Sequence, residues 1–155
     1  MKNSASTFAL AVLAVTTSGL PGCTRDNTDH KVNAVVGTWV VKDPGAPFPY
    51  HMYVFNADGT MQQANPDAGD RHSSDSDGKG VWVADGEQIR GKWVEISADR
   101  ASHGFTGRAE IAYDIKVKAD AFTGTVTARS YDAHGTLTDG PTSPTPLEGK
   151  RVTLP

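Results

Sequence analysis

The chain has 155 residues, of which 37% are hydrophobic and 21% charged, with 16 Gly and 9 Pro. These proportions predict one globular domain with many turns and exclude a disordered or collagen-like chain. The net charge of −3 gives no basic excess to neutralise phosphates, so we expect no nucleic-acid partner. The single cysteine, Cys23, excludes an intramolecular disulfide and a multi-cysteine metal site.

Residues 1–22 are predicted to be a signal peptide. Lys2 precedes the apolar run 8–15, which is shorter than the roughly 20 residues that a membrane-spanning helix needs. The next residues, Leu20-Pro21-Gly22-Cys23, resemble the bacterial lipobox, in which the cysteine is lipidated and becomes the first residue of the mature protein. The resemblance implies a lipid anchor on Cys23 and a place in the bacterial cell envelope, facing the periplasm or the surface. The alternative is an ordinary signal peptide, a secreted protein and a free thiol.

The remainder is predicted to be a flexible polar tether, residues 23–34, followed by one domain, residues 35–155. Strand-length runs alternate there with turn signals such as Asp58-Gly59 and Asp85-Gly86. We expect strands over Val36–Lys42, Tyr50–Phe55, Thr60–Gln63, Gly80–Ala84, Glu87–Ser97, Phe105–Lys118, Phe122–Tyr131, at Leu137, and over Leu147–Leu154. Because most runs can pair with their sequence neighbours, the prediction is an all-β antiparallel meander that closes into a small barrel of eight or nine strands.

The run 107–118 alternates most regularly and therefore shows which residues face inward. One face carries Gly107, Ala109, Ile111, Tyr113, Ile115 and Val117. Arg108 and Lys116 lie on the other face, which we expect to be in water. The run 122–131 alternates in the same way, and its small inward residues, Gly124 and Ala128, either leave room inside or permit tight curvature.

This pattern resembles the lipocalin-like (calycin) barrels of bacterial exported proteins. The resemblance rests on Gly37-Thr38-Trp39, on Phe55-Asn56-Ala57-Asp58-Gly59-Thr60, on Gly80-Val81-Trp82 and on Gly149-Lys150-Arg151-Val152. It implies a small apolar or amphipathic ligand inside the barrel.

Charge decides which face of the run 87–97 points inward, because apolar residues lie on both. Arg90 and Lys92 must reach water, which places Trp93 and Glu95 inside. On the run 50–55, the residue that precedes the turn, Phe55, is a core anchor. The expected ligand-binding set is His51, Tyr53, Gln63, Trp82, Trp93, Glu95 and Tyr113, which gives aromatic walls with a few polar groups.

Two other arrangements fit the same residues. The aromatic side chains could fill a packed core, with a polar partner satisfying Glu95. Alternatively, the register of the run 87–97 could be inverted, with Val94 and Ile96 in the core and Glu95 in water.

Three function classes remain open. The first is a binding module for a small hydrophobic or amphipathic ligand, without a cofactor. The second is an isomerase, cyclase or hydratase in which Glu95 and His51 form an acid–base pair. The third is an envelope protein that recognises other proteins through its outer face or through the segment Asn65–Gly78. No nucleotide, hydrolase or zinc-protease motif occurs, and the five histidines are scattered, so no metal is expected.

Two polar segments interrupt the strand pattern. The segment Asn65–Gly78 carries Asp67, Asp70, Asp75 and Asp77 and could offer oxygen ligands to Ca²⁺, but it lacks the remaining EF-hand positions. We expect a solvated, mobile loop at the barrel mouth. The segment Pro141–Pro146 is expected to be a stiff spacer before the last strand.

Overall fold

A computed structural model of the chain describes residues 33–66 and 70–155. The predicted signal peptide, Cys23 and most of the tether lie outside the described residues. Every regular element in these two ranges is a strand: β1 Gly37–Lys42, β2 Tyr50–Phe55, β3 Thr60–Ala64, β4 Ser73–Asp75, β5 Gly78–Asp85, β6 Gln88–Asp99, β7 Phe105–Lys118, β8 Ala121–Asp132, β9 Leu137–Asp139 and β10 Thr145–Arg151. Across the same residues, no helix has the length and apolar character needed to cross a membrane.

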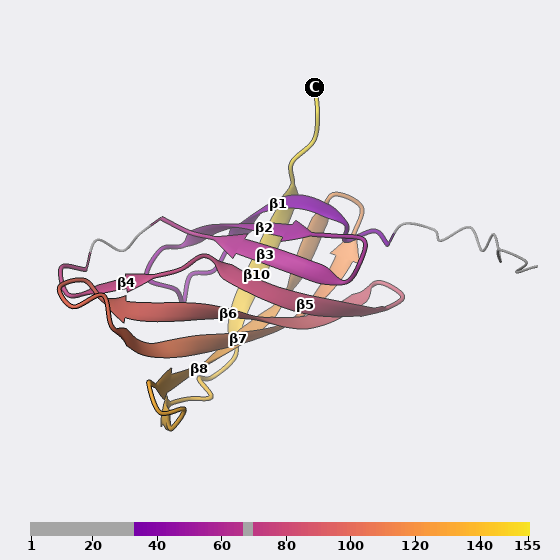
Figure 1. Cartoon of the computed structure of the whole chain (residues 1–155). Coiled ribbons are helices and arrows are strands. Elements are labelled where there is room, and N and C mark those ends of the chain that lie inside the picture. The colour runs from indigo at the N-terminus through magenta and orange to yellow at the C-terminus, as the bar shows by residue number, and fades with distance from the viewer. Residues whose placement is uncertain (1–32, 67–69) are drawn as a thin grey trace, which may run out of the picture. The chain divides into compact units, whose positions relative to one another are not determined.

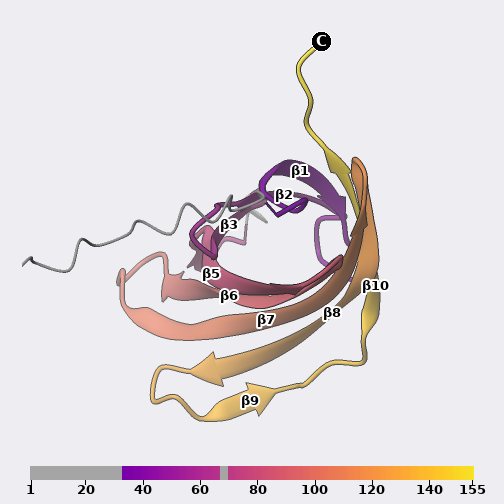
Figure 2. The same cartoon turned by 90° about the vertical axis from the view of Figure 1, so that its right-hand side faces the viewer.

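Eight of these strands form a closed antiparallel barrel (Figure 1). Neighbouring strands pair in the order β1, β2, β3, β5, β6, β7, β8 and β10. The barrel closes because β10 pairs with β1 as well as with β8. The predicted all-β meander barrel is confirmed. Figure 2 shows β6, β7 and β8 curving side by side, with β9 beyond β8. These long strands continue past the barrel, where β4 pairs with β6.

Two polar segments depart from the expectation. The segment Asn65–Gly78 was predicted to be a loop, but Ser73–Asp75 forms β4 against the end of β6. No apolar alternation announces β4, because its pairing depends on the backbone and on the length of its partner strand. The last strand starts at Thr145, inside the predicted spacer, and ends at Arg151.

The barrel interior holds the predicted inward faces. Trp93 is 4% exposed and Tyr113 is 3% exposed, whereas Ile96 is 54% exposed. The register of β6 is therefore the predicted one, and the inverted arrangement is excluded. Lys116 is exposed, and Arg108 lies on the same outer face, beside Glu110.

The two small inward residues of β8, Gly124 and Ala128, have different roles. A Cβ on Gly124 would lie 2.1 Å from the backbone oxygen of Asp114 and 2.6 Å from Cα of Ile115, so this glycine permits the close approach of β7. Ala128 instead borders open space at the barrel mouth. Both sequence interpretations hold, one at each position.

Arg151 closes the end of the barrel where the chain enters. Its guanidinium lies 4.2 Å from the ring centroid of Trp39, its Nη1 donates to the carbonyl of Val36 at 2.7 Å, and its Nε donates to Asp120 at 3.0 Å. The Trp39 indole donates to the carbonyl of Val35 at 2.8 Å. Because Arg151 covers it, we call this the closed end of the barrel. β1 runs from the closed end towards the open mouth.

Candidate functional site

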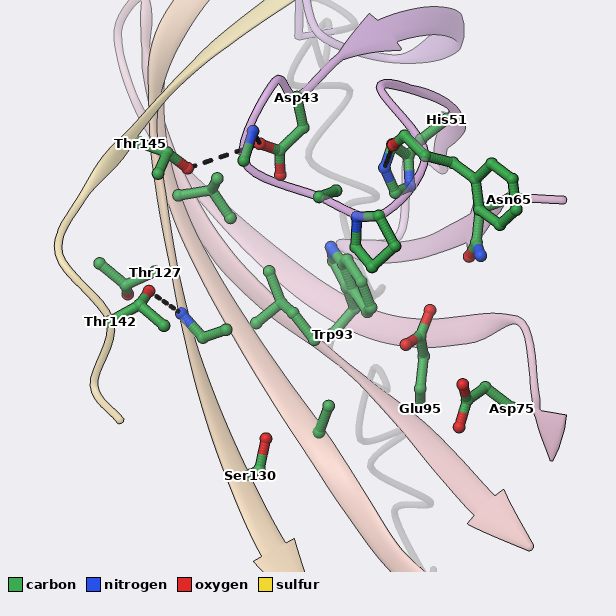
Figure 3. Close-up of a pocket in the computed structure, with 18 of the residues that line it drawn as sticks. Asp43, His51, Asn65, Asp75, Trp93, Glu95, Thr127, Ser130, Thr142 and Thr145 are labelled. Carbon is green, nitrogen blue, oxygen red and sulfur yellow. Dashed lines mark hydrogen bonds between the residues drawn. The ribbon is translucent and has the colours of Figure 1, made fainter. Parts of the chain in front are cut away.

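A cavity of about 530 Å³ opens at the mouth of the barrel (Figure 3). It is surrounded by the β1–β2 loop, by the segment that joins β4 to β5, by the N-terminal half of β7, and by the middle and C-terminal parts of β6 and β8. Its apolar wall consists of Ala46, Pro47, Phe48, Trp93, Ala109, Ile111, Val126 and Ala128. We call this space the mouth cavity. Its small side chains, Ala109 and Ala128, lie where larger ones would fill it.

The mouth cavity brings together three of the seven predicted site residues. His51, Trp93 and Glu95 line it. The other four, Tyr53, Gln63, Trp82 and Tyr113, are buried beneath it and do not line it. The lower barrel is thus a packed core and its mouth is hollow, so the two arrangements that the sequence left open occupy different levels of one barrel.

An aromatic cluster forms the floor of the mouth cavity. The Tyr53 ring lies 6.4 Å from that of Trp93, 6.2 Å from that of Tyr113 and 6.1 Å from that of Phe55. Burial raises the pKa of both tyrosines far above the ordinary value, so both phenols stay neutral. The Trp93 side chain lies near the Tyr53 hydroxyl, and this interaction lowers the pKa of Tyr53 against the larger effect of burial. Within the described residues, the Tyr113 hydroxyl is buried without a hydrogen-bond partner.

A hydrogen-bond network around Gln63 ties the β1–β2 loop to the floor. Gln63 Nε2 donates to His51 Nδ1 at 2.9 Å and to Asn65 Oδ1 at 2.6 Å, while its Oε1 accepts the Gly78 N–H at 3.0 Å. His51 Nε2 is 2.9 Å from the carbonyl of Phe48, which can only accept. His51 therefore carries its proton on Nε2 and accepts a hydrogen bond from Gln63 at Nδ1.

The predicted acid–base pair of Glu95 and His51 is not formed. Both ring nitrogens of His51 are engaged by Gln63 and Phe48, and no hydrogen bond or ion pair joins His51 to Glu95 among residues 33–66 and 70–155. Burial lowers the pKa of His51, which keeps the ring neutral and suits its role in the network. His51 is thus a support for the cavity wall.

Glu95 is the most perturbed acid of the mouth cavity. Burial raises its pKa to about 7, and the negative charges of Asp75 and Asp77 add to the shift. In Figure 3 its carboxylate points into the cavity, below the loop that carries Asp43. Asp75 and Asp77 also line the cavity. Asp75 and Asp77 were not among the predicted site residues, because both belong to a segment predicted to be a loop. The predicted position of that loop at the barrel mouth was the signal that could have identified them as cavity residues.

Replacing Glu95 by glutamine should change the thermal stability relative to the wild type in a pH-dependent way, with a result more favourable to the variant at pH 8 than at pH 5. A folded-state pKa of about 7 lies above the ordinary 4.5, so Glu95 stabilises the fold when protonated and this contribution is lost as the pH rises through 7. The lowered pKa of His51 acts in the opposite direction, because it removes stability as the pH falls below 6.5. The difference in Tm between Glu95→Gln and wild type should therefore rise from pH 5 to pH 8.

The control for this prediction is Glu148→Gln, which removes an exposed acid from the outer face of β10. Its difference in Tm from the wild type should stay constant over the same pH series. A constant difference for Glu95→Gln as well would show that this carboxyl is solvated.

The segment between β3 and β5 contains the aspartates that were predicted as possible oxygen ligands for Ca²⁺. Asp67 lies outside the described residues. The Asp70 carboxylate accepts the backbone N–H groups of His72 at 2.6 Å and Ser73 at 3.1 Å, which lowers its pKa. In the part of the chain that the structure describes, no three His, Cys, Asp or Glu side chains are placed to hold a metal ion.

Comparison with protein-family models, with curated proteins and with solved structures finds no match to this chain. The geometry of the mouth cavity and the signals of the sequence are therefore the observations that bear on its function.

Proposed function

We propose that this chain is a lipocalin-like barrel of the bacterial cell envelope that binds a small hydrophobic or amphipathic ligand in the mouth cavity. The observation that carries the proposal is the cavity itself. Its volume of about 530 Å³ is in the range of sites for small molecules, and it combines an apolar wall with a few polar groups. The Gln63 network supports the proposal, because it holds the wall in place before a ligand arrives.

Filling the mouth cavity should weaken binding of a neutral hydrophobic probe, N-phenylnaphthylamine. Ala128 lines the cavity and packs against the core, so Ala128→Trp places an indole in the space that the ligand needs. Fluorescence titration should show an affinity for the variant that is lower by about tenfold or more, which corresponds to roughly 1.4 kcal/mol.

The matched control is Ala112→Trp, the same substitution on the exposed outer face of β7. It should bind the probe like the wild type. Equal binding by the two variants would mean that the probe does not use the mouth cavity. Absence of binding to the wild type at micromolar concentrations would count against the proposed function.

The second part of the proposal is a lipid anchor at Cys23. It is supported by the lipobox-like Leu20-Pro21-Gly22-Cys23 and by the polar residues that follow. Cys23→Ser should leave the protein unprocessed or released and without label, after growth with radioactive palmitate and separation of the membranes. A variant that still takes up palmitate and stays with the membrane would refute the anchor. The thermal unfolding of the domain should not change.

Proton transfer by Glu95 is a second candidate function, and it is favoured by the raised pKa of this carboxyl inside a cavity. Mass spectrometry can separate it from binding alone. Wild type and Glu95→Gln, purified under native conditions from the source organism, should carry the same small molecule if the barrel only binds. If the barrel is an enzyme, Glu95→Gln should instead carry an unconverted substrate that the wild type does not carry.

A further inference from the structure

The polar part of the mouth cavity is acidic. Four carboxylates line it, from the β1–β2 loop, from β4, from the turn that follows β4, and from β6: Asp43, Asp75, Asp77 and Glu95. No lysine or arginine occurs among the lining residues that the structure describes. The whole chain carries 15 basic and 18 acidic residues, so this imbalance is local.

The negative potential reaches the buried floor. Burial is the main cause of the raised pKa of Glu95, and the charges of Asp75 and Asp77 raise this pKa further. The charge of Asp43 acts on His51, where it opposes the lowering by burial, and on Tyr53. Groups on three sides of the cavity thus disfavour another negative charge inside it. Because the interior is poorly solvated, this potential is screened less than it would be at the surface.

Trp93 adds a feature that suits an organic cation. In Figure 3 its indole lies between the loop that carries Asp43 and the carboxylate of Glu95. Aromatic faces attract ammonium groups, and indole does so most strongly. Ile111 and Val126 offer an apolar surface beside it.

We propose that the mouth cavity selects small amphipathic organic cations, such as alkylammonium compounds, over anionic amphiphiles of the same size. This inference rests on the proposed function, because it names the class of ligand that the cavity takes. The cationic head lies between Trp93 and the acids that line the cavity, and the apolar part lies against β7 and β8. A fatty acid or an alkyl sulfate would place its charge beside those acids without a cationic partner.

The test compares three compounds with the same alkyl chain: octyltrimethylammonium, octyl sulfate and octanol. Their binding to the purified protein is measured by isothermal titration calorimetry at pH 8 and low salt. The ammonium compound should bind about tenfold more tightly than the sulfate or better, with octanol between them. The ratio should shrink as salt is added, because screening weakens the potential of the partly exposed acids.

Two triple variants separate the local acids from the net charge. D75N/D77N/E95Q removes three acids of the cavity and should bring the ammonium-to-sulfate ratio close to one, with octanol binding unchanged. D85N/E87Q/E148Q removes three exposed acids outside the cavity and changes the net charge equally. It should keep the ratio of the wild type. If both triple variants lower the ratio equally, the selectivity is a long-range effect and the inference is wrong.

The outcomes also distinguish this inference from the proposed function. If the sulfate binds as tightly as the ammonium compound, and Ala128→Trp abolishes both, the cavity binds ligands without charge selection and only the inference fails. If none of the three compounds binds, or if Ala128→Trp has no effect on any of them, the proposed function fails as well.

Discussion

Replacing Trp93 by alanine is expected to lower the free energy of unfolding by about 3–5 kcal/mol. Trp93 is 4% exposed, lies opposite Ile111 across β6 and β7, and packs edge-on against Tyr53. Two glycines of β5 make room for it, since a Cβ on Gly78 would lie 2.6 Å from its ring and one on Gly80 would lie 2.6 Å from its Cα. Because these glycines have no side chains to fill the space, truncation at Trp93 is expected to leave a cavity beside β5.

Denaturant unfolding measures the effect, with Ile96→Ala as the control on the same strand. Ile96 is 54% exposed, so its truncation should cost less than about 1 kcal/mol. Equal losses for the two variants would contradict the burial of Trp93 and, with it, the register of β6 that positions Glu95.

Gln63→Leu is expected to cost about 2–4 kcal/mol, although leucine has a similar size and suits an apolar interior. Gln63 is 1% exposed, and its side chain partners His51 Nδ1, Asn65 Oδ1 and the Gly78 N–H. Removing it leaves two acceptors, His51 Nδ1 and Asn65 Oδ1, and one donor, the Gly78 N–H, without this partner. The unpaired groups account for the cost, because the lost hydrogen bonds alone contribute less.

The adjacent Gln62 provides the control, because its side chain is exposed on the outer face of β3 and accepts a hydrogen bond from Lys79 Nζ. Gln62→Leu should change the stability by less than about 0.5 kcal/mol. Hydrogen exchange gives a second, local measurement: the Gly78 amide should exchange faster in Gln63→Leu and not in Gln62→Leu. Unchanged protection of that amide would show that the network does not hold β5 to the floor.

The strands could be predicted because two simple signals agree along the chain. Asp58-Gly59 and Asp85-Gly86 mark hairpins, and the run 107–118 alternates without an error of phase. Where hydrophobicity was ambiguous, in the run 87–97, the need of Arg90 and Lys92 for water decided the register correctly. These signals are local, so one sequence suffices to find them.

The site was harder to predict, because it depends on distances between strands far apart in the sequence. Gly124 and Ala128 give the same signal, yet one lies under a closely packed strand and the other borders the mouth cavity. Tyr53 and His51 share a face of β2, yet only His51 reaches the cavity. Which level of the barrel is filled depends on the combined side-chain volumes of eight strands, and no single run contains that information.

The pairing of β10 with β1 has a consequence for how the barrel folds. The bond from Arg151 to the Val36 carbonyl joins positions 115 residues apart, whereas the hairpins join close neighbours. Forming such a contact carries a larger loss of chain entropy than forming any hairpin, so closure is expected to be the last step. Until then β1 and β10 each have an unpaired edge, open to pairing with another chain. A chain that lacks its final strand would keep its hairpins and would leave the edges of β1 and β8 open.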